Sequence, residues 1–261
     1  MTTKVTLTNV LRSEWTKLWS LRSTRWSLLV ACLAMAGLGP LIAALTMSRW
    51  NHMSLAQRLT IDPIDRGLGG WHIAQLAIGV LGVLVISGEY ASGQIRSSLL
   101  AVPRRLPVLW AKLIVFSGVT FVLMLITAVI SFYGSQAIFA EHHINQSLGS
   151  PHALRTLIGT VLFMTATGVF CAALGTILRA TAGGISTFVG VLFVLPPFTE
   201  ILPTGTYQAI HPYLPSNAGM AIAQAIPDSF TLSPWGGFAL FCGYTAALVA
   251  LAAYLLRRRD A

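Results

Sequence analysis

Long apolar runs alternate with short polar segments along the whole chain. A helix that crosses a bilayer needs about 20 mostly apolar residues. Six runs meet this length, at residues 26–47, 71–88, 113–133, 154–178, 184–202 and 235–256. Together they hold about half of the 261 residues. The pattern therefore predicts an all-α integral membrane protein with six transmembrane helices.

The segments between the runs are too short for a second folded domain. The longest has about 32 residues, which is below the size at which a chain usually forms a stable core by itself. The first run is too long for a signal peptide, and 25 residues precede it. We expect one transmembrane domain over residues 26–261, preceded by a separate helix over residues 1–25.

Charged residues are scarce, and their distribution predicts how the chain is oriented in the membrane. Only 10% of residues are charged, and the formal net charge is +9. Of the 17 Lys and Arg residues, 13 fall on the side of both termini and 4 on the other. The positive-inside rule then places both termini in the cytoplasm. Cations beside anionic headgroups explain the basic character without nucleic acid.

The segment before the first run repeats apolar side chains at helical spacing. Trp15, Leu18 and Trp19 lie near one face, whereas Glu14 and Lys17 lie largely around the other. Tryptophan favours the boundary between membrane and water. The spacing predicts an amphipathic helix that lies in this interface.

A second short helix is expected between the fifth and sixth runs. Five prolines divide residues 203–234 and enclose an apolar stretch over residues 216–226. Ser216 or Asn217 can cap its start, and Pro227 can stop it. About ten residues cannot span a bilayer, so we expect a re-entrant segment in the outer leaflet or over a cavity. The residues assigned to this segment are Pro215, Ser216, Asn217 and Gly219.

The residues that membrane enzymes and carriers need are missing from the apolar runs. No Asp lies in any run, and no GxxxxGK[ST] phosphate loop occurs. Glu89, Lys112 and Glu200 fall at the ends of runs, where an ionised side chain costs less than at a helix centre. The three cysteines lie in apolar runs without CxxC spacing, which indicates packing. We expect no catalytic residue and no cofactor in this chain.

The second outer loop clusters potential metal ligands. It holds Glu141, His142, His143 and His152. Adjacent histidines point apart on a helix, and no HExxH pattern is present, so the residues favour a loop without a metal.

Small residues recur four apart in the fourth and fifth runs. They are Gly168, Ala172, Thr176 and Ala180, followed by Gly183 and Thr187. Such ladders let helix backbones approach closely, either within one chain or between two copies.

The segment that follows the second run predicts a short exposed helix. Within residues 89–105, Ile95 and Leu99 share an apolar face, and the helix ends before Pro103. On these residues alone, a docking helix and a simple connector on the membrane surface both remain possible.

This segment resembles the ABC type-2 exporter permease family. Members carry an acidic residue, a glycine and then a Leu-rich stretch that ends in Pro-x-Arg. The matching residues are Glu89, Gly93, Leu99, Pro103 and Arg105. Residues 13–18 and 213–219 are similar to a subgroup that is common in high-GC Gram-positive bacteria.

The resemblance implies a permease without ATPase activity in the bacterial cell membrane. It would pair as a homodimer, or with a close paralogue, and bind two separate ATPase subunits that hold ATP and Mg. Residues 89–105 would form the coupling helix, and the N-terminal helix would be the connecting helix. The expected coupling residues are Glu89, Gly93, Ile95, Arg96, Leu99, Pro103, Arg104 and Arg105. Those expected on the connecting helix are Glu14, Trp15, Lys17, Leu18 and Trp19.

The apolar spans favour a lipophilic or amphiphilic cargo, such as a drug, an antibiotic peptide or a lipid. Two other classes stay open. An ion-coupled secondary carrier would transport without ATP and stop when the ion gradient collapses. A non-transporting immunity or signalling protein would fail to stimulate any partner ATPase.

Overall fold

The computed structural model describes residues 6–93, 105–226 and 230–258. Across these ranges the chain is helical without strands, and six helical segments are long and apolar enough to cross a membrane. They are α2 (Arg22–Ser48), α5 (Trp71–Ala91), α7 (Arg105–Phe139), α8 (Ala153–Leu178), α9 (Thr181–Val189) continued by η3 (Gly190–Val194) and α10 (Leu195–Thr199), and α13 (Pro234–Arg258). The predicted all-α membrane fold is confirmed.

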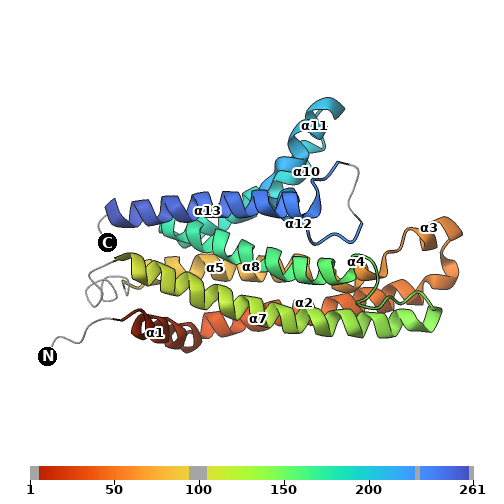
Figure 1. The fold of residues 1–261 in the computed structure, drawn as a ribbon, viewed down its shortest axis with the longest axis horizontal. Helices are drawn as coiled ribbons and strands as arrows, with labels where there is room; N and C mark the ends of the chain where they lie inside the picture. The colour runs from red at the N-terminus through yellow and green to blue at the C-terminus, as the bar shows by residue number, and fades with distance from the viewer. Residues whose placement is uncertain (1–5, 94–104, 227–229, 259–261) are drawn as a thin grey trace.

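Short helices fill the remaining segments. They are α1 (Leu7–Ser20), η1 (Trp50–His52), α3 (Leu55–Leu59), α4 (Pro63–Leu68), η2 (Ala140–His142), α11 (Thr204–Ile210), η4 (His211–Tyr213) and α12 (Pro215–Met220). Helix α1 and the last turn of α13 lie at one end of the bundle, here called the terminal end (Figure 1). Helices α3 and α4 lie at the opposite, distal end.

Helix α7 is much longer than the apolar run over residues 113–133 that predicts it. Polar residues near its distal end stay inside the bundle because α4 supplies backbone acceptors. Ser131 Oγ donates to the Gly67 carbonyl at 2.8 Å, and Gln136 Nε2 donates to the Pro63 carbonyl at 3.0 Å. These side chains interrupt the apolar pattern without ending the helix.

The fifth span is one continuous helix whose geometry changes along its length. Pro196 and Pro197 have no backbone N–H to donate to the preceding turn. The helix widens into a π turn just before them and ends at Thr199, earlier than the run over residues 184–202 predicts.

Helix α8 forms the centre of the bundle and packs against α5, α7, α9 and α13. Close approach to α5 depends on glycine: a Cβ at Gly82 would lie 2.5 Å from the Gly168 carbonyl oxygen. The α8 part of the small-residue ladder therefore packs within the chain. Its continuation on α9 differs, because Gly183 and Thr187 are exposed.

Candidate functional site

Helix α1 docks along the bundle through one buried stripe. Thr6 caps its start, with Oγ1 accepting from the Asn9 N–H at 3.4 Å. Val10, Glu14 and Leu18, each four residues apart, are buried, and the helix packs mainly on α7. Glu14, which the sequence pattern places on the polar side, is thus directed into the protein. Its position is explained by the cations that meet it there.

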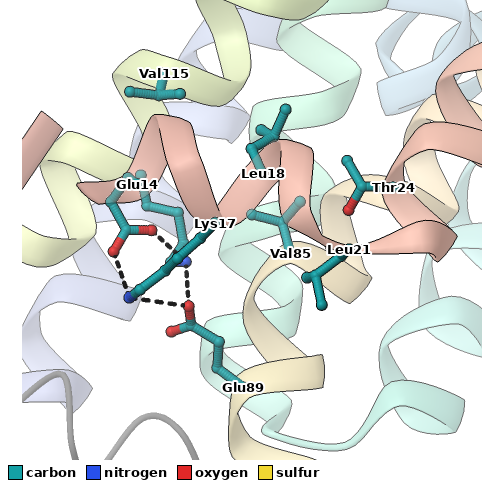
Figure 2. Close-up of a pocket in the computed structure, with 9 residues that line it drawn as sticks. Glu14, Lys17, Leu18, Leu21, Thr24, Val85, Glu89 and Val115 are labelled. Atoms are coloured by element: carbon teal, nitrogen blue, oxygen red, sulfur yellow. Dashed lines mark hydrogen bonds and ion pairs between the residues drawn. The ribbon is translucent and has the colours of Figure 1, made fainter. Parts of the chain in front are cut away.

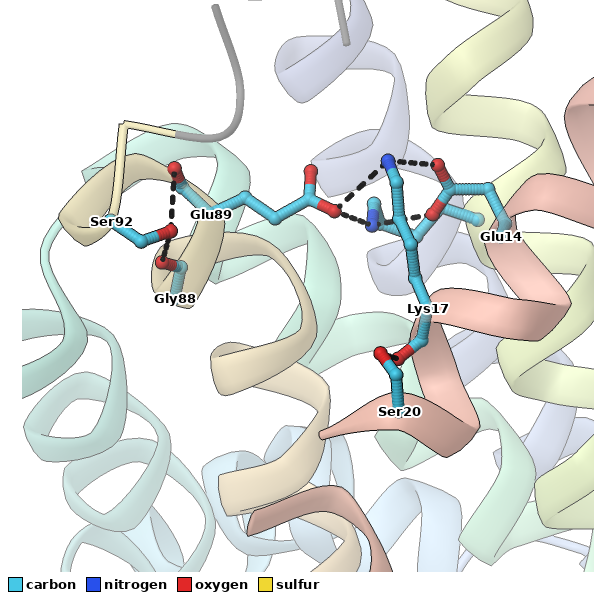
Figure 3. Close-up of polar contacts among 7 residues, drawn as sticks. Glu14, Lys17, Ser20, Gly88, Glu89 and Ser92 are labelled. Carbon is cyan, nitrogen blue, oxygen red and sulfur yellow. Dashed lines mark hydrogen bonds and ion pairs between the residues drawn. The ribbon is translucent and has the colours of Figure 1, made fainter. Parts of the chain in front are cut away.

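Four charged side chains form a cluster between α1, α5 and α7, here called the terminal cluster (Figures 2 and 3). Lys112 Nζ, from the third turn of α7, donates to Glu14 Oε2 at 2.7 Å and to Glu89 Oε1 at 2.8 Å. Lys17 Nζ donates to Glu14 Oε1 at 2.7 Å and to Glu89 Oε1 at 3.3 Å. The two glutamates and two lysines balance in charge, so the cluster joins three helices without a net charge.

The members of the terminal cluster differ in burial. The side chains of Glu14, Glu89 and Lys112 are 4%, 5% and 7% exposed, whereas that of Lys17 is 31% exposed. Removing one partner of a buried pair typically costs about 3–5 kcal/mol. Contacts of a partly exposed lysine are weakened by solvent screening. Lys112 is therefore the cation on which the cluster depends most.

The pKa shifts of Glu14 and Lys17 show that their ion pairs and hydrogen bonds together have a larger effect than burial. Burial by itself raises the pKa of Glu14, but the charge and hydrogen bond of Lys112, together with Lys17, bring this pKa below its ordinary value. Burial likewise lowers the pKa of Lys17, but hydrogen bonds and charge from Glu14 and Glu89 raise it above the ordinary value overall. Both side chains are therefore charged at neutral pH.

One carboxylate oxygen of Glu89 has no hydrogen-bond donor among the described residues. Its Oε2 atom is buried and makes no hydrogen bond to any residue that the structure describes. A cavity of about 20 Å³ lies beside the cluster and is also lined by Leu18, Thr24 and Val85 (Figure 2). This volume suits a single small donor such as water.

Helix α5 ends at Ala91, two residues after Glu89. Ser92 Oγ donates to the Gly88 carbonyl at 2.9 Å, and Gly93 adopts the left-handed φ of 71° that favours glycine at a helix end (Figure 3). Arg105 begins α7, and its side chain is not described. The other predicted coupling residues, Ile95, Arg96, Leu99, Pro103 and Arg104, lie outside the described residues.

The two predicted interfacial tryptophans face away from the bundle. Trp15 and Trp19 are 51% and 37% exposed, and their rings meet edge to face with centroids 5.9 Å apart. Leu18, between them in sequence, is buried. Helix α1 thus presents aromatic surface outward and charge inward.

A family model described as ABC-2 family transporter protein matches residues 10–195. The matched region is more than two thirds of the chain and contains the whole terminal cluster. The chain belongs to the ABC-2 transporter family. It is therefore a permease, the membrane component of an ABC transporter. None of the curated proteins compared with it matches the chain.

The predicted outer segment of the permease contains a shorter helix than expected. Helix α12 begins at Pro215 with Leu214 as its N-cap and ends at Met220, so neither Ser216 nor Asn217 is the cap. Asn217 instead donates from Nδ2 to the His211 carbonyl at 2.8 Å. Ser216 Oγ contacts Asn217 Oδ1 at 3.4 Å, and Gly219 packs closely against Phe163 and Phe241.

Beyond α12, two charged residues hold the non-helical backbone over residues 221–226. Arg155 of α8 donates to the Ile222 carbonyl at 3.3 Å and to the Ala225 carbonyl at 2.9 Å. Asp65 of α4 accepts from the Ala225 N–H at 2.8 Å through Oδ1. These contacts, here called the distal clasp, replace the bonds that a longer helix would have made, which explains the early end of α12.

The histidines of the second outer loop have structural contacts. The His142 ring lies 5.2 Å from the Trp50 ring, centroid to centroid. His143 and His152 both adopt left-handed backbone conformations at turns. Within the described ranges, no three His, Cys, Asp or Glu side chains gather as metal ligands.

The sequence pattern did not identify three of the residues that form the terminal cluster and the distal clasp. Lys112 is noted there only as a charge at the end of a run, and Arg155 and Asp65 are not singled out. Lys112 directly precedes a long apolar run, and Arg155 is the second residue of another. A charged residue at the end of an apolar run needs a partner when the helix continues past it. This placement in the sequence could have identified Lys112 and Arg155 as residues with polar partners.

Proposed function

We propose that the permease works in an ATP-driven exporter with a separate ATPase subunit and a second permease, either an identical copy or a close paralogue. It resides in the bacterial plasma membrane with both termini in the cytoplasm, as the 13 to 4 division of cations favours. ATP and Mg bind to the partner subunit. The cargo is lipophilic or amphiphilic, such as a drug, an antibiotic peptide or a lipid.

The observation that carries this proposal is the terminal cluster. It ties α1 to the last turn of α5 and to α7, on either side of the segment that resembles the coupling helix. A push from an ATPase on that segment would move α5 and α7 together with α1, because breaking the buried pairs is costly. The cluster thus supports a role for α1 as a lever linked to the coupling segment.

A second permease is supported by the fifth span. Of the six spans it is the least buried within the described chain, at 22% of its residues. Small and polar residues, among them Gly183, Ser186 and Thr187, are exposed on α9. Hydroxyl groups and small side chains favour contact with another helix over contact with lipid tails. This face is where we place the second permease.

The experiment compares two Leu→Asp variants after co-expression with the ATPase subunit that we propose as the partner. Leu99→Asp places a charge on the predicted docking face, whereas Leu59→Asp makes the same change on α3 at the distal end, where Leu59 is 77% exposed. We expect Leu99→Asp to abolish co-purification of the ATPase and Leu59→Asp to preserve it. Burying one aliphatic side chain is worth about 1.5–3 kcal/mol, more than an exposed ion pair.

Reconstitution in vesicles separates the other functions. Transport that needs ATP and the ATPase subunit supports the exporter. Transport by the permease alone that follows an ion gradient would identify a secondary carrier. Equal ATPase capture by both Leu→Asp variants would move the docking site away from residues 89–105.

A further inference from the structure

The start of α2 carries two arginines that have no acidic partner among the described residues. Arg22 and Arg25 lie one turn apart and are exposed. Neither guanidinium has an ion pair or hydrogen bond to another part of the chain that the structure describes. The two acids described at this end, Glu14 and Glu89, are already bound by lysines. Within the part of the chain that the structure describes, this surface therefore carries two positive charges without an acidic partner.

The arginines border an open recess of about 470 Å³ whose other walls are apolar. Trp26 and Leu29 complete its lining and are 66% and 45% exposed. Spacings of three and four residues place all four side chains on one face of α2. The recess thus joins cationic groups to an aromatic ring and an aliphatic side chain.

The apolar part of this face continues along the span. Val30 and Leu33 follow Leu29 toward the middle of α2, and both are exposed. A soluble ATPase subunit could reach the arginines but not Leu33, which lies within a span. A phospholipid matches both parts, because it joins a phosphate to acyl chains.

We propose that this face binds one anionic glycerophospholipid, with its phosphate between Arg22 and Arg25 and an acyl chain along Leu29 and Leu33. Guanidinium groups bind phosphate through forked, charge-assisted hydrogen bonds. The Trp26 ring lies at the headgroup level, where indoles are favoured. The bound lipid fixes the junction of α1 and α2 at the membrane surface. This inference goes beyond the proposed function and does not depend on the cargo.

The test measures lipid retention by native mass spectrometry of the full-length permease, titrated with phosphatidylglycerol or phosphatidylcholine. The variant is Arg22→Gln with Arg25→Gln. The matched control is Arg257→Gln with Arg258→Gln, which removes the same charge from the last turn of α13 at the same end of the bundle. We expect the first variant to bind phosphatidylglycerol at least about tenfold more weakly, since it removes the charge-assisted hydrogen bonds to the phosphate. The control should stay within about twofold of the unmodified permease.

A second measurement leaves the arginines intact. Tryptophan fluorescence of the permease and of Trp26→Phe is compared in vesicles that contain brominated phosphatidylglycerol or brominated phosphatidylcholine. The difference between the two proteins isolates Trp26, and we expect brominated phosphatidylglycerol to quench it more strongly.

Three results would overturn the proposal. Equal loss of lipid in both double variants would show a general field of positive charge rather than a site. Equal quenching of Trp26 by the two brominated lipids would remove the preference for an anionic headgroup. Retained lipid with lost capture of the ATPase subunit in the Arg22 and Arg25 variant would assign the face to a protein partner.

Discussion

Charged residues make polar contacts at both ends of the bundle, buried at the terminal end and half-buried at the distal end, but these residues have different partners. In the terminal cluster, Lys112 binds two other side chains, those of Glu14 and Glu89. In the distal clasp, Arg155 and Asp65 bind backbone atoms of residues 221–226. One end joins three regular helices, and the other holds a segment that is not helical.

This difference follows from where backbone hydrogen bonds are satisfied. A helix satisfies its own backbone, so the four charges of the terminal cluster bind one another's side chains rather than backbone groups. A non-helical segment in an apolar setting needs partners for its N–H and carbonyl groups. The charged side chains of the distal clasp therefore bind backbone N–H and carbonyl groups, which a side-chain substitution does not remove. The two ends should respond differently when both charged partners are replaced.

The largest effect is expected from Lys112→Met. It leaves Glu14 and Glu89 buried with only the partly exposed Lys17 between them, and we expect the stability to fall by about 3–5 kcal/mol. Thermal unfolding of the purified permease in detergent measures the change. Protease accessibility of α1 shows whether this helix is released first.

The double variant Glu89→Leu with Lys112→Leu is the control for Lys112→Met. It removes both members of a pair and leaves Glu14 with Lys17. Replacing a complete buried pair by apolar side chains is often neutral, so most of the lost stability should return. A double variant as unstable as Lys112→Met would show that the charges are not what holds the three helices together.

A smaller effect is expected from Arg155→Met at the distal end. The Ile222 and Ala225 carbonyls lose their donors, at a cost of about 1–3 kcal/mol. Hydrogen exchange over residues 221–226 should become faster, while exchange in α1 stays the same.

Replacing both charges of the distal clasp sharpens the comparison. In Asp65→Leu with Arg155→Met the backbone groups still lack partners, so we expect no recovery of stability, unlike the terminal double variant. Full recovery would mean that attraction between the two side chains, rather than their backbone bonds, holds the segment. The distinction between the two ends would then fail.

Hydropathy was sufficient to predict the six spans, because the bilayer makes the length of an apolar run decisive. Hydropathy predicted the ends of the helices less well, because tertiary contacts determine where a helix ends. Gln136 lies beyond the predicted end of the third run, yet α4 accepts its hydrogen bond and α7 continues. The end of α12 was predicted too late because Arg155 lies about 70 residues away in sequence.

The terminal cluster was only partly visible in the sequence. Glu14 and Lys17 were assigned to the solvated side of α1, and Glu89 to a separate coupling segment. Which face of α1 docks depends on where α7 places Lys112, and no local pattern contains that information. A charged residue on an otherwise apolar helix face indicates a partner, but the partner itself is found only in three dimensions.

The smallest effect is expected from pH, acting on the two α1 residues of the terminal cluster. The folded pKa of Glu14 lies below its ordinary value of 4.5, so its contribution to stability is present above pH 4.5 and is lost as the pH falls through the folded pKa. The folded pKa of Lys17 lies above 10.5, so its contribution is present below pH 10.5 and is lost as the pH rises through the folded pKa. Docking of α1, followed by the fluorescence of Trp15 and Trp19, should therefore stay constant from about pH 5 to about pH 10. Glu14→Gln should remove the acid limb of this profile, and an acid limb that persists unchanged in that variant would assign the transition to another group.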